Sequence, residues 1–266
     1  MCSSDLAARA PALRTEPPAP TLASRLWFGW VVVVVGVLSG VLSPLLVLQS
    51  AFRPTAETFA TWMRPWARGI LRAIGVRLRV IGSVPEGPVV FVANHQNALD
   101  IPATSAGLPR PFLFVARHEL RTWPIVGWVL EKSACLFIRR DNPREALRDL
   151  RQAGERIRGG ESVLLFPEGG RSYRHGTEPF MKGAFVLAIE AGVPLVPVTL
   201  VGHMGVVDER TKRARPGEIR LVLGEPIATA DRRRGDAGAL ADEVRATIAE
   251  TLAAYGEPRA GGAPSS

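Results

Sequence analysis

The stretch VVFVANHQNALD occupies residues 89–100 and decides the fold that we expect. Its first five residues form an uninterrupted apolar run, and polar residues that include His95 and Asp100 follow at once. A short apolar run without alternation is typical of a strand that is buried on both faces. Such strands occur in parallel or mixed sheets covered by helices, so this stretch favours an α/β fold.

Further runs along the chain have the same character. They are short, rich in Val, Leu, Phe and Ile, and separated by segments with helical patterns. They occupy residues 78–81, 112–115, 134–138, 162–166, 195–201 and 219–223. The sequence therefore predicts a mixed, largely parallel sheet covered by helices.

One of the helices has clear signals at both ends. Asn142 can cap it, Pro143 suits its first position, and Gly159-Gly160 ends it. Two more helices are expected over about 183–190 and 239–254.

The polar residues at the end of the first stretch could act as an acid and a base. Ligands gather at the carboxyl ends of strands in open α/β sheets, and His95 stands at such an end. An imidazole can take a proton near neutral pH, and a carboxylate on its far nitrogen fixes the tautomer. Asp100 follows five residues later, and this spacing does not put two side chains on the same face of a helix. A turn must therefore bring the pair together. Two interpretations are open: a base with its orienting carboxylate, or a capping His and an Asp at the next helix start.

The stretch LLFPEGGRS at residues 164–172 is a second candidate site. Its glycines allow a ligand to approach the backbone closely. The guanidinium of Arg171 can donate two parallel hydrogen bonds, which suits phosphate. Lys182, just before the helix expected from residue 183, could meet an anion together with the N–H groups of that helix. The alternative is a surface turn with solvated charges.

Residues 26–48 contain no charge and form the most apolar stretch of the chain. As a helix they would reach roughly 34 Å, against about 30 Å for the hydrocarbon core of a bilayer. A cleaved signal peptide is the alternative, but its apolar region would be shorter, and no clear small-residue cleavage site follows. We therefore expect an uncleaved membrane anchor, with Pro44 leaving a bent or re-entrant helix open.

The segment after the anchor is amphipathic. Arg64, Arg68 and Arg72 fall on one face of a helix, and Pro65 is expected at its start or at a kink. The opposite face carries Phe59, Trp62, Met63, Trp66, Ile70 and Ile74. Either this helix lies in a membrane interface or it packs on the domain. Two tryptophans beside an anchor favour the interface.

Composition excludes several classes of protein. With 47% apolar residues and only two cysteines, the chain is neither a solvated disordered chain nor a disulfide-dense or cysteine-rich zinc fold. The net charge is +8, but most of the excess lies in residues 1–80, beside the apolar stretch rather than on the folded domain. This position favours attraction to an anionic membrane over nucleic-acid binding.

Three motifs occur in this order along the chain: NHxxxxD at residues 94–100, FPEGxR at 166–171 and VPLVPV at 193–198. Together they make the chain resemble the glycerolipid acyltransferase family, close to the bacterial 1-acyl-glycerol-3-phosphate acyltransferases. The resemblance runs from about residue 70 to 225.

Two lesser stretches also fit the family. FVARHEL at residues 114–120 has Arg117 where lysine is usual, and LFIRR at 136–140 has Arg140 in the basic position. Two positions depart from the family pattern. Gly170 stands where threonine is usual, and Asn97 where serine is frequent.

The resemblance implies transfer of a fatty acyl group from acyl-CoA or acyl-carrier protein to the free sn-2 hydroxyl of lysophosphatidic acid (1-acyl-glycerol 3-phosphate), giving phosphatidic acid. His95 would be the general base and Asp100 its orienting group. The implied substrate-binding residues are Arg117, Arg140, Glu168, Gly169, Arg171 and Lys182. No metal and no cofactor besides the thioester co-substrate is expected, and no metal-ligand spacing is visible.

Three alternatives remain open. The acceptor could be a lyso-ornithine lipid or glycerol-3-phosphate, the donor could be a phospholipid, or the chain could be a non-catalytic membrane lipid-binding protein. Arginine counts beside the anchor favour a cytoplasmic position for the part that follows it, so we expect the catalytic domain on the cytoplasmic face of the cell's inner membrane. The sequence leaves open the acyl-chain length and the oligomeric state.

The expected domain organisation has four parts. They are a disordered segment over 1–25, a membrane anchor and interfacial helix over 26–76, the acyltransferase domain over 77–255 and a disordered tail over 256–266. The first six residues, MCSSDL, look like the translation of a common sequencing-adapter end. We hypothesise that residues 1–6 are a gene-calling artefact, which a native peptide covering them would contradict.

Overall fold

The structure, a computed structural model, describes residues 21–50, 55–123, 126–132, 135–139, 142–172 and 177–255. Its centre is a seven-stranded sheet. The strands are β1 (Val76–Ile81), β2 (Val90–Ala93), β3 (Phe112–Arg117), β4 (Leu136–Ile138), β5 (Ser162–Leu165), β6 (Leu195–Val201) and β9 (Gly217–Leu223), and β7 (Val207–Asp208) pairs separately with β8 (Arg213–Ala214).

The strand order of the sheet is β1-β9-β6-β2-β5-β3-β4. The strands from β6 to β4 are parallel to one another, whereas β9 is antiparallel to β6 and parallel to β1. This confirms the predicted mixed, largely parallel sheet. Every residue of β2, β5 and β6 is buried, as their uninterrupted apolar runs predict. Because these three strands are parallel neighbours, their carboxyl ends meet at one edge of the sheet.

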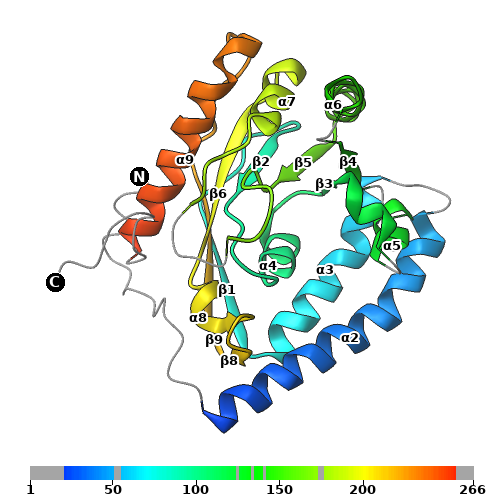
Figure 1. The fold of residues 1–266 in the computed structure, drawn as a ribbon, viewed down its shortest axis with the longest axis vertical. Helices are drawn as coiled ribbons and strands as arrows, with labels where there is room; N and C mark the ends of the chain where they lie inside the picture. Colours follow the sequence, from blue (N-terminus) through cyan, green and yellow to red (C-terminus); the bar gives the residue numbers. More distant parts are fainter. Residues whose placement is uncertain are drawn as a thin grey trace.

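Helices cover both faces of the sheet (Figure 1). They are α2 (Leu22–Ser50), α3 (Ala56–Ala73), α4 (Asp100–Gly107), α5 (Val126–Lys132), α6 (Pro143–Arg158), α7 (Gly183–Ala191), α8 (His203–Val206) and α9 (Ala237–Ala254), with the 3-10 turns η1 (His118–Thr122) and η2 (Arg234–Asp236). The side chains of α6, α7 and α9 form one apolar core with the sheet, and those of α2, α3 and α4 form the other.

The predicted helix ends are confirmed where the sequence marked them. Asn142 Oδ1 accepts hydrogen bonds from the N–H groups of Arg144 and Glu145 at the start of α6, and Gly159 caps its end. Helix α7 ends at Gly192, which has the left-handed φ of 68° that glycine adopts without strain.

Helices α2 and α3 form an antiparallel pair that lies side by side (Figure 1). The indole N–H of Trp30 donates to the carbonyl of Ala73, and that of Trp66 donates to Ser39 Oγ. Within the described residues, α2 alone is long and apolar enough to cross a membrane, with a mean hydropathy of 2.2 in the part Leu22–Leu45. It begins at Leu22, ahead of the predicted anchor, and continues past Pro44.

The apolar face of α3 packs inside the protein, which corrects its expected place in a membrane interface. Phe59, Ile70 and Leu71 are buried, and α3 contacts α4, β1 and β3 as well as α2. A helix in a membrane interface and a helix packed on the domain need the same amphipathic pattern. In this structure neighbouring parts of the protein cover the apolar face. The helix begins at Ala56 with a Thr55 cap, so Pro65 lies inside it rather than at its start. The disorder predicted for the tail 256–266 and for most of 1–25 lies outside the described residues.

Candidate active site

His95 and Asp100 form the predicted pair. His95 Nδ1 lies 2.8 Å from Asp100 Oδ2, because a turn after β2 folds the chain back before α4 begins at Asp100. Asp100 Oδ2 also accepts the N–H groups of Gln96 and Asn97, at 2.7 and 3.1 Å. With Nδ1–H donated to the carboxylate, Nε2 of His95 holds the lone pair that can take a proton. The geometry thus supports the base interpretation over simple capping.

Asp100 is fully buried, and a second imidazole faces it. His203 Nε2 lies 3.4 Å from Asp100 Oδ1, and the side chain of His203 is also fully buried. Burial by itself raises the pKa of Asp100, but the charges of His203 and His95 and the hydrogen bonds lower that pKa below its ordinary value. Asp100 therefore stays ionised beside the His95 imidazole.

The loop after β5 closes over His95. The ring of Phe166 stacks on the His95 imidazole with centroids 4.2 Å apart. Glu168 Oε1 accepts the His95 N–H at 3.1 Å, and the Ser172 N–H donates to the His95 carbonyl at 3.0 Å. Both sides of the His95 backbone are thus tied to this loop, which brings the two sequence motifs together as predicted.

Glu168 has an unusual protonation state. Burial, reinforced by the charge of Asp100, raises the pKa of Glu168 to about 8, although its hydrogen bond from the His95 N–H lowers it. Glu168 Oε2 is buried within the protein. At neutral pH this side chain is therefore mostly a neutral carboxylic acid that can donate a hydrogen bond.

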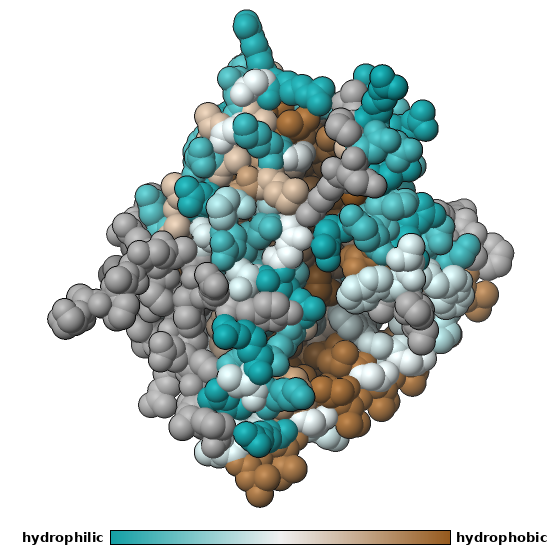
Figure 2. Space-filling model, viewed as in Figure 1, coloured by the Kyte–Doolittle hydropathy of each residue, from teal (hydrophilic) through white to brown (hydrophobic). Residues whose placement is uncertain are grey.

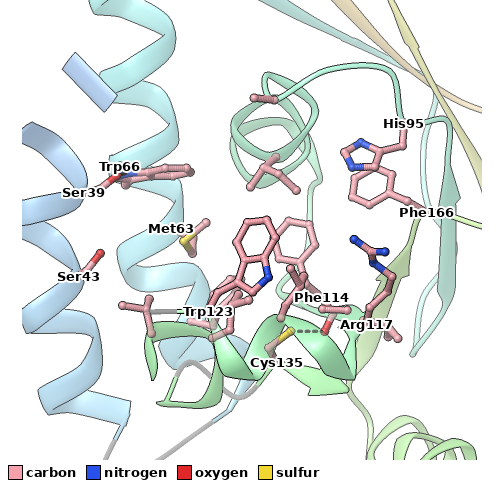
Figure 3. A pocket seen from close by; sticks show the side chains of 18 of the residues that line it. Ser39, Ser43, Met63, Trp66, His95, Phe114, Arg117, Trp123, Cys135 and Phe166 are labelled. Atoms are coloured by element: carbon pink, nitrogen blue, oxygen red, sulfur yellow. Dashed lines mark hydrogen bonds between the residues drawn. The ribbon is translucent and has the colours of Figure 1, made fainter. Parts of the chain in front are cut away.

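A cavity of about 580 Å³ adjoins His95. Figure 3 shows His95 and Phe166 at one end and Trp66 and Ser39 of the α3–α2 pair at the other. Most of the remaining lining is apolar, including Phe59, Trp62, Met63, Ile101, Phe114, Trp123, Val129 and Cys135. A mostly apolar cavity with a few polar groups at one end suits a lipid-like ligand.

Two of the predicted cations line this cavity. Arg117, at the end of β3, directs its guanidinium toward His95 and Phe166 (Figure 3). Arg171 lies on the loop after β5, and its Nη1 pairs with Glu209 at 2.7 Å. Glu209 Oε1 also accepts the Ala98 N–H at 2.8 Å.

The other predicted site residues are placed differently. Gly169 lines the cavity and has a φ of 78°, a left-handed conformation that favours glycine. Lys182 does not line the cavity: its side chain lies against Gly238 of α9. Arg140 lies outside the described residues, so its predicted role stays a prediction. Among the described residues, no cluster of three or more His, Cys, Asp or Glu could hold a metal ion.

Sequence reasoning missed the segment after β6. His203 follows the carboxyl end of β6, and His95 follows the carboxyl end of β2. Because the two strands are parallel neighbours, the sequence could have indicated that His203 lies near His95. Asn97, which departs from the family's serine, binds this segment: its Nδ2 donates to the carbonyls of His203 and Val207, each at 3.0 Å. The longer amide side chain thus fixes the segment that holds His203 against Asp100.

The chain is similar to known acyltransferases. The profile of the Acyltransferase family matches residues 76–201. The chain is 32% identical over 217 residues to a 1-acyl-sn-glycerol-3-phosphate acyltransferase of Chlamydomonas reinhardtii, covering 80% of this chain but only 63% of that protein. It is 31% identical over 194 residues to the lyso-ornithine lipid O-acyltransferase of Pseudomonas aeruginosa, covering 65% of this chain and 71% of that protein.

The crystal structure of the 1-acyl-sn-glycerophosphate acyltransferase PlsC from Thermotoga maritima has a similar fold. The TM-score is 0.67 at 23% identity, over 87% of this chain and 94% of that chain. This likeness concerns the fold. Because the profile match contains both motifs, and the Pseudomonas relative is matched over most of its own length, the chain belongs to the acyltransferase family.

Proposed function

We propose that the protein transfers a fatty acyl group from acyl-CoA or acyl-carrier protein to the sn-2 hydroxyl of lysophosphatidic acid, giving phosphatidic acid. The observation that carries the proposal is the His95–Asp100 pair at the polar end of a largely apolar cavity. The name of the algal relative supports the same acceptor.

The chemistry needs no protein nucleophile, because the acceptor supplies its own hydroxyl. His95 Nε2 takes the hydroxyl proton as the oxygen attacks the thioester carbonyl carbon. The tetrahedral intermediate then collapses: the carbon–sulfur bond breaks, and the leaving thiolate takes the proton back from the His95 imidazolium. Asp100 holds the ring and stabilises its positive charge, as in a catalytic triad whose serine hydroxyl is replaced by that of the acceptor.

The two cations of the cavity suit the acceptor's phosphate. Arg171 and Arg117 both line the cavity near His95, and a guanidinium binds phosphate through two parallel hydrogen bonds. A short glycerol arm joins the reacting hydroxyl to the phosphate, so a cation beside the base is where the phosphate must bind. Glu168 does not line the cavity, and it supports the site by accepting the His95 N–H.

Both substrates carry long acyl chains, and we infer that the protein takes them from the cytoplasmic face of the inner membrane. One face of α2 is apolar and exposed over its whole length, through Leu22, Leu26, Trp30, Val33, Val37, Val41, Leu45 and Leu48. These side chains form an apolar margin of the molecular surface over α2 (Figure 2). The inner face of α2 lines the cavity through Ser39, Leu42 and Ser43, which gives a lipid a short route to it.

A second candidate function is acylation of a lyso-ornithine lipid. It is favoured by the Pseudomonas relative of that name, which this chain matches over 71% of its length. The same base and cavity would serve, and only the headgroup contacts would differ.

A thiol-release assay with detergent-solubilised full-length protein tests the proposal. Acyl-CoA is supplied with lysophosphatidate or with a lyso-ornithine lipid, and with His95→Ala as the inactive variant. His118→Ala is the matched control, because His118 does not line the cavity. Release that requires lysophosphatidate and His95 supports the proposal, release only with the ornithine lipid supports the second candidate, and release that persists in His95→Ala contradicts the mechanism.

A further inference from the structure

Glu209 holds the donors that an acceptor's phosphate would need. Its carboxylate lies 2.7 and 3.0 Å from Nη1 of Arg171, and its Oε1 also accepts the Ala98 N–H at 2.8 Å. A guanidinium and a backbone N–H that converge on one group form a small anion site. In this structure a carboxylate of the chain itself occupies that site.

The anion site adjoins the base. Ala98 and Arg171 both line the cavity, and Glu209, which does not line it, contacts both. Ser172, the neighbour of Arg171, donates its N–H to the carbonyl of His95 at 3.0 Å. The site is thus within the short reach of a glycerol phosphate whose hydroxyl lies at His95.

The segment that carries Glu209 is anchored at its base, and within the turn Asp208 Oδ1 accepts the N–H groups of Arg210 and Thr211. Asn97 Nδ2 binds the carbonyls of His203 and Val207, which hold the start of the segment. Glu209 itself lies in the turn between β7 and β8, two strands of two residues each. A turn on so short a hairpin can shift without disturbing the sheet.

We propose that Glu209 stands in for the acceptor's phosphate and determines the specificity of the acceptor site. The carboxylate keeps Arg171 and the Ala98 N–H in place while the site is empty, and a phosphate must displace it in order to bind. A phosphate of higher charge competes for these donors more strongly than a zwitterionic headgroup does. Glu209 therefore lowers the affinity for every acceptor but admits the phosphate-bearing one. The inference rests on the proposed function, because it takes a lysophosphatidate as the ligand.

Equilibrium binding without any thioester tests this role apart from catalysis. The dissociation constant of 1-oleoyl-lysophosphatidate in detergent micelles is measured by calorimetry for the full chain, for Glu209→Gln and Glu209→Ala, and for Arg171→Ala. The glutamine keeps the shape and the acceptor oxygen but removes the charge. Glu243→Gln is the matched control, because it neutralises a carboxylate of α9 that pairs with Arg232 and does not line the cavity.

Both Glu209 variants should bind lysophosphatidate about threefold to tenfold more tightly, since they remove a competing ion pair of modest strength. Glu243→Gln should bind as the unchanged chain does, and Arg171→Ala more weakly. Unchanged or weaker binding by Glu209→Gln would overturn the proposal. So would a selective loss of lyso-ornithine lipid binding, because Glu209 would then be a ligand for the ammonium group.

A parallel turnover assay separates this inference from the proposed function. Tighter binding by Glu209→Gln without acyl transfer to lysophosphatidate would refute the function and leave the role of Glu209 standing. Acyl transfer without tighter binding would refute the role of Glu209 alone. If neither the unchanged chain nor Glu209→Gln binds lysophosphatidate, both fail.

Discussion

The carboxylate of Asp100 contacts His203 through the oxygen that His95 does not use. His203 Nε2 lies 3.4 Å from Asp100 Oδ1, and neither side chain is exposed to solvent. A carboxylate buried without water needs such neighbours to remain ionised. His203 thus acts on the proposed base, His95, through Asp100, and it does not line the cavity.

Replacing His203 by leucine should therefore alter the chemistry rather than substrate binding. The interaction with His203 lowers the pKa of Asp100, so without it that pKa rises, and the acid limb of kcat/KM moves to higher pH. We expect kcat to fall roughly tenfold, less than the factor of about 10²–10⁴ for losing a general base. His203→Gln, which keeps a donor, should recover part of the rate. Equal losses in both variants with an unshifted pH profile would mean that His203 only fills space.

The base and its partner should each be indispensable to turnover. His95→Ala removes the proton acceptor, and Asp100→Asn removes the charge that stabilises the imidazolium, so each should lower kcat by about 10²–10⁴. Circular dichroism checks that the fold persists. Turnover within a factor of a few of the unchanged enzyme in either variant would exclude the assigned role.

Glu168 should make the folded state less stable as the pH rises. Its pKa is about 8 in the folded chain against 4.5 for a free side chain, so between these values the folded state binds the extra proton. Stability present below pH 4.5 is then lost progressively up to about pH 8. Urea unfolding of Glu168→Gln should match that of the unchanged chain at pH 4 and become the more stable of the two by pH 9. Parallel stability curves would show that Glu168 is not protonated when folded.

The sequence predicted the sheet edge that carries the candidate site, because parallel strands end together. His95 follows β2 and Glu168 follows β5, and these strands are direct neighbours in the sheet. Once the runs are recognised as buried parallel strands, the two motifs are expected at the same edge, and the observed strand order makes them neighbours. The helix caps at Asn142 and Gly192 depend on local geometry and were equally predictable.

Contacts that depend on distant packing were not predictable. The apolar face of α3 could be covered by lipid or by protein, and the same residues serve both. Lys182 precedes a helix as expected, but that helix packs on α9, which turns the amine away from the cavity. Glu209 meets Arg171 only because a hairpin with two-residue strands bends back, and such strands leave no periodic pattern.

Adjacent glycines of the Glu168 loop should respond differently to a methyl group. Gly169 has a φ of 78°, so Gly169→Ala should cost about 1–2 kcal/mol and disturb the His95 contacts. Gly170 has no positive φ, and no described atom lies within 4 Å of an added Cβ, so Gly170→Ala should be nearly neutral. Gly170→Thr, which restores the usual residue of the family, should also fold normally. The melting temperature and kcat of the alanine variants test this difference. Equal effects at the two positions would contradict the prediction.

The outer face of α2 should control binding to lipid without affecting the active site. Val33 and Val37 are 55% and 58% exposed on that face, so lysines there need not disturb packing within the protein. If the face lies in a bilayer, Val33→Lys with Val37→Lys should weaken association with anionic vesicles by at least about tenfold, because lysine is costly in an apolar membrane region. Val80→Lys, at a valine that is 45% exposed on β1, is the matched control. Turnover on micellar lysophosphatidate should persist in the double variant, because neither valine lines the cavity. Vesicle binding that is unchanged by the two lysines would show that another surface meets the membrane.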